Sequence, residues 1–300
     1  MLWIAQVAGK RSDLFYIMDK ISIDEFVDSI EQLPSLPESC RKIEEIIEDP
    51  NAAPSDLAAV IETDAGLASR IFKLANSPYV AIPGGVDDLA RAVSFLGFST
   101  IHQIVICVQS YELLGKCGAT IPPWINKHSL AVAAVSEFAA ARLGLPFPPK
   151  AYTAGLLHDM GRLAIAALYP KSLETYCETV SAGAIHSLEL ERDTMGVDHL
   201  EVGFELADYW NYPPVLAAVI SSHHPPLASY PEQWGSGPME LAEVVSIADN
   251  WAWQAGVKGI PSGSPIPPGE QRPKTMDLPL ELDTELMEEV VGEISSRSSL

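Results

Sequence analysis

The sequence predicts an all-α fold of two helical lobes, followed by a linker and a short C-terminal helix. Apolar residues recur with helical spacing along almost the whole chain, and the first 115 residues contain no alternating strand pattern. Proline- and glycine-rich stretches separate the helical blocks. A chain of 300 residues, of which 47% are hydrophobic, is long enough to build two packed lobes.

Composition shifts along the chain predict five segments. We expect an N-terminal extension over 1–23, a first helical lobe over 24–118, a second lobe over 119–257, a proline-rich linker over 258–282 and a C-terminal helix over 283–300.

The first block carries a succession of amphipathic helices. Ile43, Ile46 and Ile47 lie among glutamates on the first of them, which ends at Asp49-Pro50. Pro54-Ser55-Asp56 begins the next helix. Further helices are predicted over 65–75, 86–96 and 100–114, with a proline- and glycine-containing loop after the first of these three.

The second block is helical as well. Helices are predicted over 124–143, 150–168, 173–182, 189–210, 214–223 and 239–255. In the final segment Asp283 can cap a helix whose apolar face carries Leu286, Val290 and Ile294. We expect that helix to dock on its own protein; binding to a partner is the alternative.

The charge of the chain excludes some functions. Nineteen basic against forty acidic residues give a formal net charge of −21. Such a surface repels phosphate backbones and anionic lipids, so neither nucleic acid nor a membrane is an expected partner.

Cysteine usage and the N-terminus predict a soluble cytoplasmic protein. The four cysteines form no CxxC pair and no zinc-like spacing, which suits a reducing compartment. The apolar start Leu2–Val7 is too short for a signal peptide, and its basic residues follow it. No apolar run approaches the roughly 20 residues that cross a bilayer.

Histidines and aspartates in the second block carry the chemistry. His158-Asp159 is predicted in the middle of an apolar helix, His223-His224 ends another helix, and Asp249 and His128 lie on two more. Burying such groups is costly without partners, and grouping them around a cation removes that cost. Imidazole and carboxylate ligands suit iron, manganese, zinc or nickel, so one or two divalent transition-metal ions are the expected cofactor. On one helix His158 and Asp159 would project about 100° apart and could reach one cavity at a helix crossing.

Each of these signals has a simpler interpretation. His102 and His186 are expected to be hydrogen-bonded core residues. Asp249 could cap a helix or form a salt bridge, and His223-His224 could be a surface helix end. Order and spacing taken together carry more weight than any one residue.

Several segments resemble one family. The run from "LPSLPESCRKIEEIIEDP" to "ANSPYV", followed by "AVSFLGFSTIHQIVI", is similar to the opening of the HDOD family, the HD-related output domain of bacterial signalling. The segments "WINKHSLAVAA", "AGLLHDMGRLAI", "HLEVGFELADYW" and "VISSHHPP" follow in the family's order. The resemblance covers roughly residues 24–255. It implies two helical lobes, a second lobe similar to HD-domain phosphohydrolases, and a regulatory role.

The resemblance also implies a set of ligands. The HD pattern matches His128, His158, Asp159 and Asp249, which would hold one metal ion. The HD-GYP phosphodiesterases, which cleave cyclic di-GMP, add three histidines, and the matching residues are His199, His223 and His224. Asp159 would then bridge two ions.

Two departures bear on catalysis. Arg162 stands where the HD-GYP group usually has lysine, and Arg keeps the charge without the compact ammonium. The segment "PPLASYPEQW" lacks the acidic and glycine residues of the "HHExxDGxGYP" signature. Metal binding is therefore expected more strongly than cleavage of cyclic di-GMP.

The expected function is a bacterial signal-transduction output module whose partners are other signalling proteins. One alternative is a metal-dependent phosphohydrolase, in which Asp159 would bridge the metals and Arg162 would stabilise charge on the phosphoryl oxygens. Another is a sensor that binds a nucleotide ligand without cleaving it. The sequence leaves the oligomeric state open.

Overall fold

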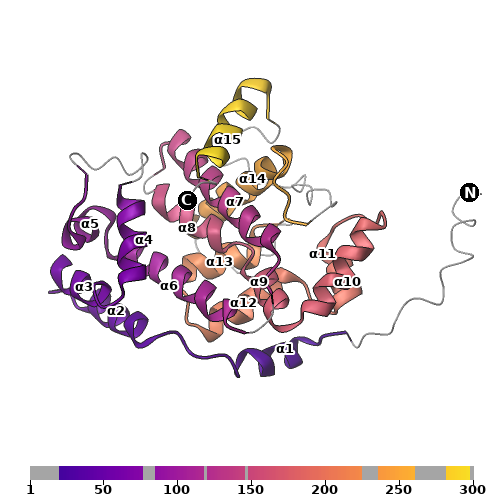
Figure 1. Cartoon of the computed structure of the whole chain (residues 1–300), viewed down its shortest axis with the longest axis horizontal. Helices are drawn as coiled ribbons and strands as arrows, with labels where there is room; N and C mark the ends of the chain where they lie inside the picture. Colours follow the sequence, from indigo (N-terminus) through magenta and orange to yellow (C-terminus); the bar gives the residue numbers. More distant parts are fainter. Residues whose placement is uncertain are drawn as a thin grey trace, which may run out of the picture.

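The computed structural model describes residues 20–76, 85–117, 120–145, 148–224, 236–260 and 282–297. Within these ranges every regular element is a helix, in agreement with the predicted all-α fold (Figure 1). The helices are α1 Ile23–Ile30, α2 Glu38–Glu48, α3 Pro54–Ile61, α4 Ala65–Ala75, α5 Leu89–Leu96, α6 Phe98–Gly115, α7 Pro123–Arg142, α8 Pro148–Leu157, α9 Met160–Leu168, α10 Pro170–Ser181, α11 Leu188–Met195, α12 His199–Tyr209, α13 Pro214–Ser222, α14 Ser236–Gln254 and α15 Thr284–Arg297.

Two hydrophobic cores confirm the two helical lobes. The first core joins α2 to α5 with one face of α6, and the second joins another face of α6 with α1 and with α7 to α15. In α6, Ile104 and Val105 belong to the first core, whereas Ile106 and Leu114 belong to the second. This helix therefore connects the lobes, and Figure 1 shows it between them.

Helix α1 was not predicted from the sequence. Ser22 and Glu25 form a capping box at its start, a signal that the sequence does carry. Phe26 and Ile30 are buried in the second core, where α1 packs against α12. Although α1 lies within the interval expected for the first lobe, it packs on the second. The five predicted segment boundaries stay predictions.

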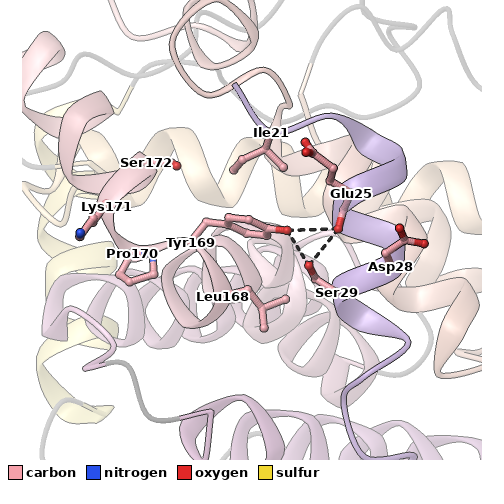
Figure 2. Close-up of a pocket in the computed structure, with 9 residues that line it drawn as sticks. All are labelled: Ile21, Glu25, Asp28, Ser29, Leu168, Tyr169, Pro170, Lys171 and Ser172. Carbon is pink, nitrogen blue, oxygen red and sulfur yellow. Dashed lines mark hydrogen bonds between the residues drawn. The ribbon is translucent and has the colours of Figure 1, made fainter. Parts of the chain in front are cut away.

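Helix α1 is also held at the junction between α9 and α10. Figure 2 shows the Tyr169 hydroxyl between the Ser29 hydroxyl, 2.6 Å away, and the Glu25 carbonyl, to which it donates at 3.1 Å. These residues line a surface pocket of about 690 Å³. The Ile21 amide, just before α1, donates to the Met195 carbonyl at 2.8 Å and so connects the start of α1 to the end of α11.

Two segments that were each predicted to be one helix are two helices in the structure, so both predictions were wrong. The segment 150–168 breaks at His158-Asp159 into α8 and α9, and Asp159 has φ −95° and ψ 24°. No glycine or proline marks that junction, so the pattern could not reveal it. The segment 189–210 breaks after α11 because Gly196 adopts φ 93° and Asp198 then caps α12.

Helices α9 and α12 cross at two glycines. A Cβ atom on Gly161 would lie 1.8 Å from the His199 carbonyl oxygen, and one on Gly203 would lie 3.3 Å from the Gly161 amide nitrogen. Only hydrogen at these positions lets the two backbones approach this closely. The crossing brings the first turn of α12 beside the first turn of α9.

Helix α15 docks on its own protein, as predicted. Leu286, Val290 and Ile294 are buried, and the helix packs along α7. Asp283 accepts a hydrogen bond from the Leu286 amide at 2.9 Å, so it caps the helix. Most of the predicted proline-rich linker, residues 261–281, lies outside the described residues.

Among the described residues no single helix is long and apolar enough to cross a bilayer, and one bent pair, α5 with α6 at 110°, meets the criteria on length and composition.

We predict that Gly161→Ala destabilises the protein by about 2–3 kcal/mol, because the added methyl group meets the α12 backbone. Urea denaturation followed by circular dichroism measures the loss. Gly292→Ala in the exposed face of α15 is the control; its Cβ meets nothing within 4 Å, and it should stabilise by up to about 1 kcal/mol. Equal effects of the two substitutions would contradict the close crossing.

Candidate metal centre

The structure brings the seven predicted ligands together in the second lobe. His128 lies in α7, His158 and Asp159 lie between α8 and α9, and Asp249 lies in α14. His199 is the first residue of α12, and His223 and His224 directly follow α13. All seven side chains are buried, and none of these residues is more than 7% exposed. Their role as ligands stays a prediction.

One group of ligand atoms surrounds Oδ2 of Asp159. The Nε2 atom of His158 lies 3.5 Å from Oδ2, and that of His128 lies 3.8 Å from it. His128 Nε2 also lies 3.0 Å from Oδ1 of Asp249. Two imidazoles and two carboxylates therefore converge here; we call these four residues the first group.

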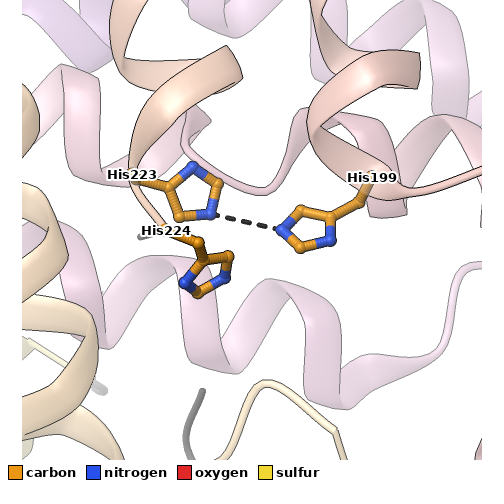
Figure 3. Close-up of side chains that lie close together, drawn as sticks. All are labelled: His199, His223 and His224. Atoms are coloured by element: carbon orange, nitrogen blue, oxygen red, sulfur yellow. Dashed lines mark hydrogen bonds between the residues drawn. The ribbon is translucent and has the colours of Figure 1, made fainter. Parts of the chain in front are cut away.

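A second group surrounds the other oxygen of Asp159. Nε2 of His199 and Nε2 of His223 lie 3.5 and 3.6 Å from Oδ1. The two Nε2 atoms are 3.3 Å apart, and the ring of His224 lies beside them (Figure 3). His199, His223 and His224 offer ligand atoms within 4.8 Å of one another; we call them the second group.

The geometry and chemistry of these residues fit metal ions. Donor atoms about 2.1 Å from one ion stand roughly 3.0–3.5 Å from each other, close to the separations found here. Of the buried side-chain atoms without a hydrogen-bond partner in the described structure, five belong to the candidate ligands: Nε2 of His128, His158 and His224, and Oδ1 of Asp159 and Asp249. Buried polar atoms rarely go unsatisfied, and a cation would satisfy these.

Four imidazoles are oriented through their Nδ1 atoms. Nδ1 lies 2.7 Å from the Gly155 carbonyl in His158, 3.1 Å from the Val257 carbonyl in His128 and 3.2 Å from the Val219 carbonyl in His223. In His199 it lies 2.6 Å from a carboxylate oxygen of Glu191. Such contacts fix the tautomer and leave Nε2 available to a metal, as is usual for ligating histidines.

Glu191 was not predicted from the sequence as part of the site. Its side chain is fully buried, accepts from the His199 backbone amide at 2.9 Å, and lies 3.1 Å from Nη2 of Arg162. Nη1 of Arg162 lies 2.5 Å from Oδ2 of Asp159. Arg162 therefore links the central carboxylate to the carboxylate that orients His199. In the acidic run "LELERD" nothing distinguishes Glu191 from its neighbours.

The buried charges set the protonation states of the metal-free site. Burial would raise the pKa of Asp159, but Arg162 and His158 hold it well below its usual range. Burial lowers the pKa of His158 to about 3, and it also lowers those of His223 and His224. These imidazoles are thus neutral at neutral pH, which is the form that binds metals.

His128 differs from the other imidazoles. Burial opposes its protonation, but contact with Asp249 prevails and raises its pKa, while His128 in turn lowers the pKa of Asp249. A proton on this pair must leave when a metal ion binds.

His102 and His186 are not ligands in either group. His102 is partly buried in the first lobe, 3.4 Å from a carboxylate oxygen of Glu44. His186 is buried as predicted, bonded to the Tyr176 hydroxyl and stacked on Trp253. It also lies beside Arg162, with its Nε2 atom 3.5 Å from Nη2, so it forms part of the wall of the site.

The backbone after α14 lies against the first group. A Cβ atom on Gly259 would stand 2.9 Å from Nε2 of His128 and 3.3 Å from Nη1 of Arg162. Gly259 and Ile260 are buried. The segment "PPLASYPEQW", whose sequence departs from the HD-GYP signature, lies outside the described residues.

Comparison with known families assigns the chain. A family model described as the HDOD domain matches residues 33–226, which include six of the seven candidate ligands. The chain belongs to the HDOD family. Asp249 follows the matched region, which is shorter than the 24–255 covered by the resemblance.

Solved structures share the fold of this HDOD protein. It is similar to an HDOD domain protein of unknown function from Geobacter sulfurreducens, at 24% identity and a TM-score of 0.63 over 91% of this chain and 87% of that one. A protein from Marinobacter aquaeolei VT8 assigned to signal transduction has 25% identity and a TM-score of 0.62, over 91% of this chain and 58% of that one. A protein from Shewanella amazonensis SB2B assigned as a metal-dependent phosphohydrolase has 16% identity and a TM-score of 0.58, over 92% and 95%.

A curated relative is longer than this chain. An uncharacterized protein of Treponema pallidum (strain Nichols) is 27% identical over 197 residues, which are 66% of this chain and 38% of that protein. The HDOD chain thus spans less than two fifths of the length of that relative.

We predict that His186 makes the metal-free protein acid-sensitive. Burial and Arg162 lower its pKa from 6.5 to about 3, so between these values the unfolded chain binds a proton that the folded one does not. Stability therefore falls as pH drops below 6.5. Urea denaturation in chelator at pH 7 and pH 4.5 should show a wild-type loss about 2 kcal/mol larger than that of His186→Gln. Equal losses would contradict the assigned environment.

Proposed function

We propose that this HDOD protein is a cytoplasmic signalling module of bacteria whose second lobe binds a divalent transition metal. Iron, manganese, zinc and nickel all suit its imidazole and carboxylate ligands. The observation that supports metal binding is the convergence of four Nδ1-anchored imidazoles on the two oxygens of one buried carboxylate, Asp159. Membership of the HDOD family supports a regulatory role. The sparse cysteines, of which Cys40 and Cys107 are free and buried, suit a reducing compartment.

A regulatory role is also supported by the enclosure of the site. Structural metal sites are closed by protein ligands, whereas catalytic sites keep a position open for water or substrate. Here the ligand residues are at most 7% exposed, and Gly259 lies against His128 and Arg162. A metal ion in the first group would then hold α7, the junction of α8 and α9, and α14 together. Other signalling proteins are the proposed partners, and the net charge of −21 disfavours nucleic acids and anionic membranes.

A metal-dependent phosphohydrolase is the second candidate. The position of Asp159 between two groups of ligands supports it, because two-metal sites use a shared carboxylate. Bound metal ions would supply Lewis-acid chemistry. Of the chain's own residues, Asp159 would hold the ions, and Arg162 would present a permanent positive charge to a phosphoryl group. A sensor that binds a nucleotide without cleaving it would use the same positive charge.

We predict that the protein, purified without chelators, contains transition metal and that His158→Ala loses it. Elemental analysis measures the content, and a thermal melt should show a lower Tm in His158→Ala because the metal stabilises only the folded state. His102→Ala is the matched control, a histidine of the first lobe whose loss should leave the metal content unchanged. Absence of metal even after reconstitution would contradict the proposal.

The two functional candidates differ in turnover. With bis-p-nitrophenyl phosphate and cyclic dinucleotides as substrates, the regulatory module gives no product above the buffer rate. Product formation that disappears in both His158→Ala and Asp159→Ala would instead establish a phosphohydrolase. Stoichiometric binding of a cyclic dinucleotide without product would favour the sensor.

A further inference from the structure

Arg162 lies beside both groups of candidate ligands. It is only 2% exposed and is held in the first turn of α9. Nη1 contacts Oδ2 of Asp159 at 2.5 Å, and Nη2 contacts Oε1 of Glu191 at 3.1 Å. Nη2 also lies 3.2 and 3.4 Å from the two ring nitrogens of His199. The guanidinium is thus fixed by two ion pairs, with Nη1 on Oδ2 of Asp159 in the first group and Nη2 beside the ring of His199 in the second.

The two groups differ in the charge available to a cation. The first group contains two carboxylates, Asp159 and Asp249, beside its imidazoles. The second group has imidazoles alone; it shares Oδ1 of Asp159 and lies farther from Asp249, whose Oδ2 is 3.9 Å from Nδ1 of His224. Glu191, the nearest further carboxylate on that side, is paired with Arg162. A divalent ion in the first group therefore lies nearer to Asp249, whereas an ion in the second group meets the guanidinium beside both ring nitrogens of His199.

The total charge of the buried groups favours one bound ion over two. Asp159, Asp249 and Glu191 contribute three negative charges, and Arg162 contributes one positive charge that arginine does not lose in proteins. One divalent ion brings these groups to neutrality. A second ion would leave a net positive charge in an enclosure with low exposure, where like charges repel strongly.

The guanidinium cannot easily move away from a second ion. Leaving its position would break the pairs with Asp159 and Glu191 and leave two carboxylates buried without that partner. An ion bound to Nε2 of His199 would be next to Nη2, which lies 3.4 Å from the same atom. A lysine would supply the same charge, but arginine's planar fork reaches both carboxylates at once.

We propose that Arg162 acts as a fixed cation that keeps a second metal ion out of His199, His223 and His224, so that the site holds one tightly bound ion in the first group. This inference rests on the proposed metal binding. Loss of the guanidinium should open the second group to an ion, while the first group keeps its own.

The test counts metal ions per chain. Wild-type protein and Arg162→Met, which keeps a long side chain without charge, are reconstituted with Mn²⁺, desalted and measured by elemental analysis; titration calorimetry with Mn²⁺ gives the affinities. Wild type should hold one ion, and Arg162→Met should hold two, the second bound at least about tenfold more tightly than in wild type. Arg192→Met is the matched control, since Arg192 pairs with Asp198 outside the site and is half exposed; it should hold one ion.

Ligand substitutions locate the ions. In wild type, His223→Ala should leave one ion, whereas His158→Ala should leave none. In Arg162→Met, adding His223→Ala should return the count from two to one. If circular dichroism shows that Arg162→Met does not fold, His223→Ala and His158→Ala in the wild-type background still test whether the wild-type ion lies in the first group.

Three results would overturn the inference: two tightly bound ions in wild type, one ion in folded Arg162→Met, or loss of the wild-type ion in His223→Ala. These results leave the proposed metal binding intact. Absence of any bound Mn²⁺ in wild type would defeat the proposed function, and this inference with it.

Discussion

A buried carboxylate in a helical core requires cations or hydrogen-bond donors around it, and the second lobe places such groups around Asp159. This residue is 3% exposed, yet its pKa is held well below the usual range, so its charge is present inside the lobe. Arg162 supplies one positive charge, and four imidazoles direct their Nε2 atoms toward the two carboxylate oxygens of Asp159. Burial of that charge without these partners would cost several kcal/mol.

The backbone is shaped to deliver those partners. The break between α8 and α9 lets His158 and Asp159 leave the regular helix, and the turn at Gly196 lets His199 begin a new helix. Gly161 and Gly203 then allow α9 and α12 to approach until Asp159 and His199 face each other. Two breaks between helices and one close helix crossing thus bring together one cluster of side chains.

Helical periodicity and residue identity predicted much of this protein, but not its junctions. The two lobes, the docking of α15 and most of the converging histidines and aspartates could be predicted, because apolar spacing and buried polar types are local signals, whereas His199 was predicted only through the family resemblance. The break at His158-Asp159 could not, because the apolar run continues across it and long-range contacts decide the backbone there. Glu191 was missed for a related reason: its partners Arg162 and His199 are distant or separated by a turn. Gly196 and the Ser22–Glu25 capping box were readable signals.

The central claim is that Asp159 is the centre of a metal site, and crystals of Mn²⁺-loaded protein test it most directly. An anomalous difference map should show a peak within coordination distance of the Asp159 carboxylate and of Nε2 of His128 and His158. A peak found only at surface residues, or a well-ordered site with Arg162 and water but no peak, would contradict the account.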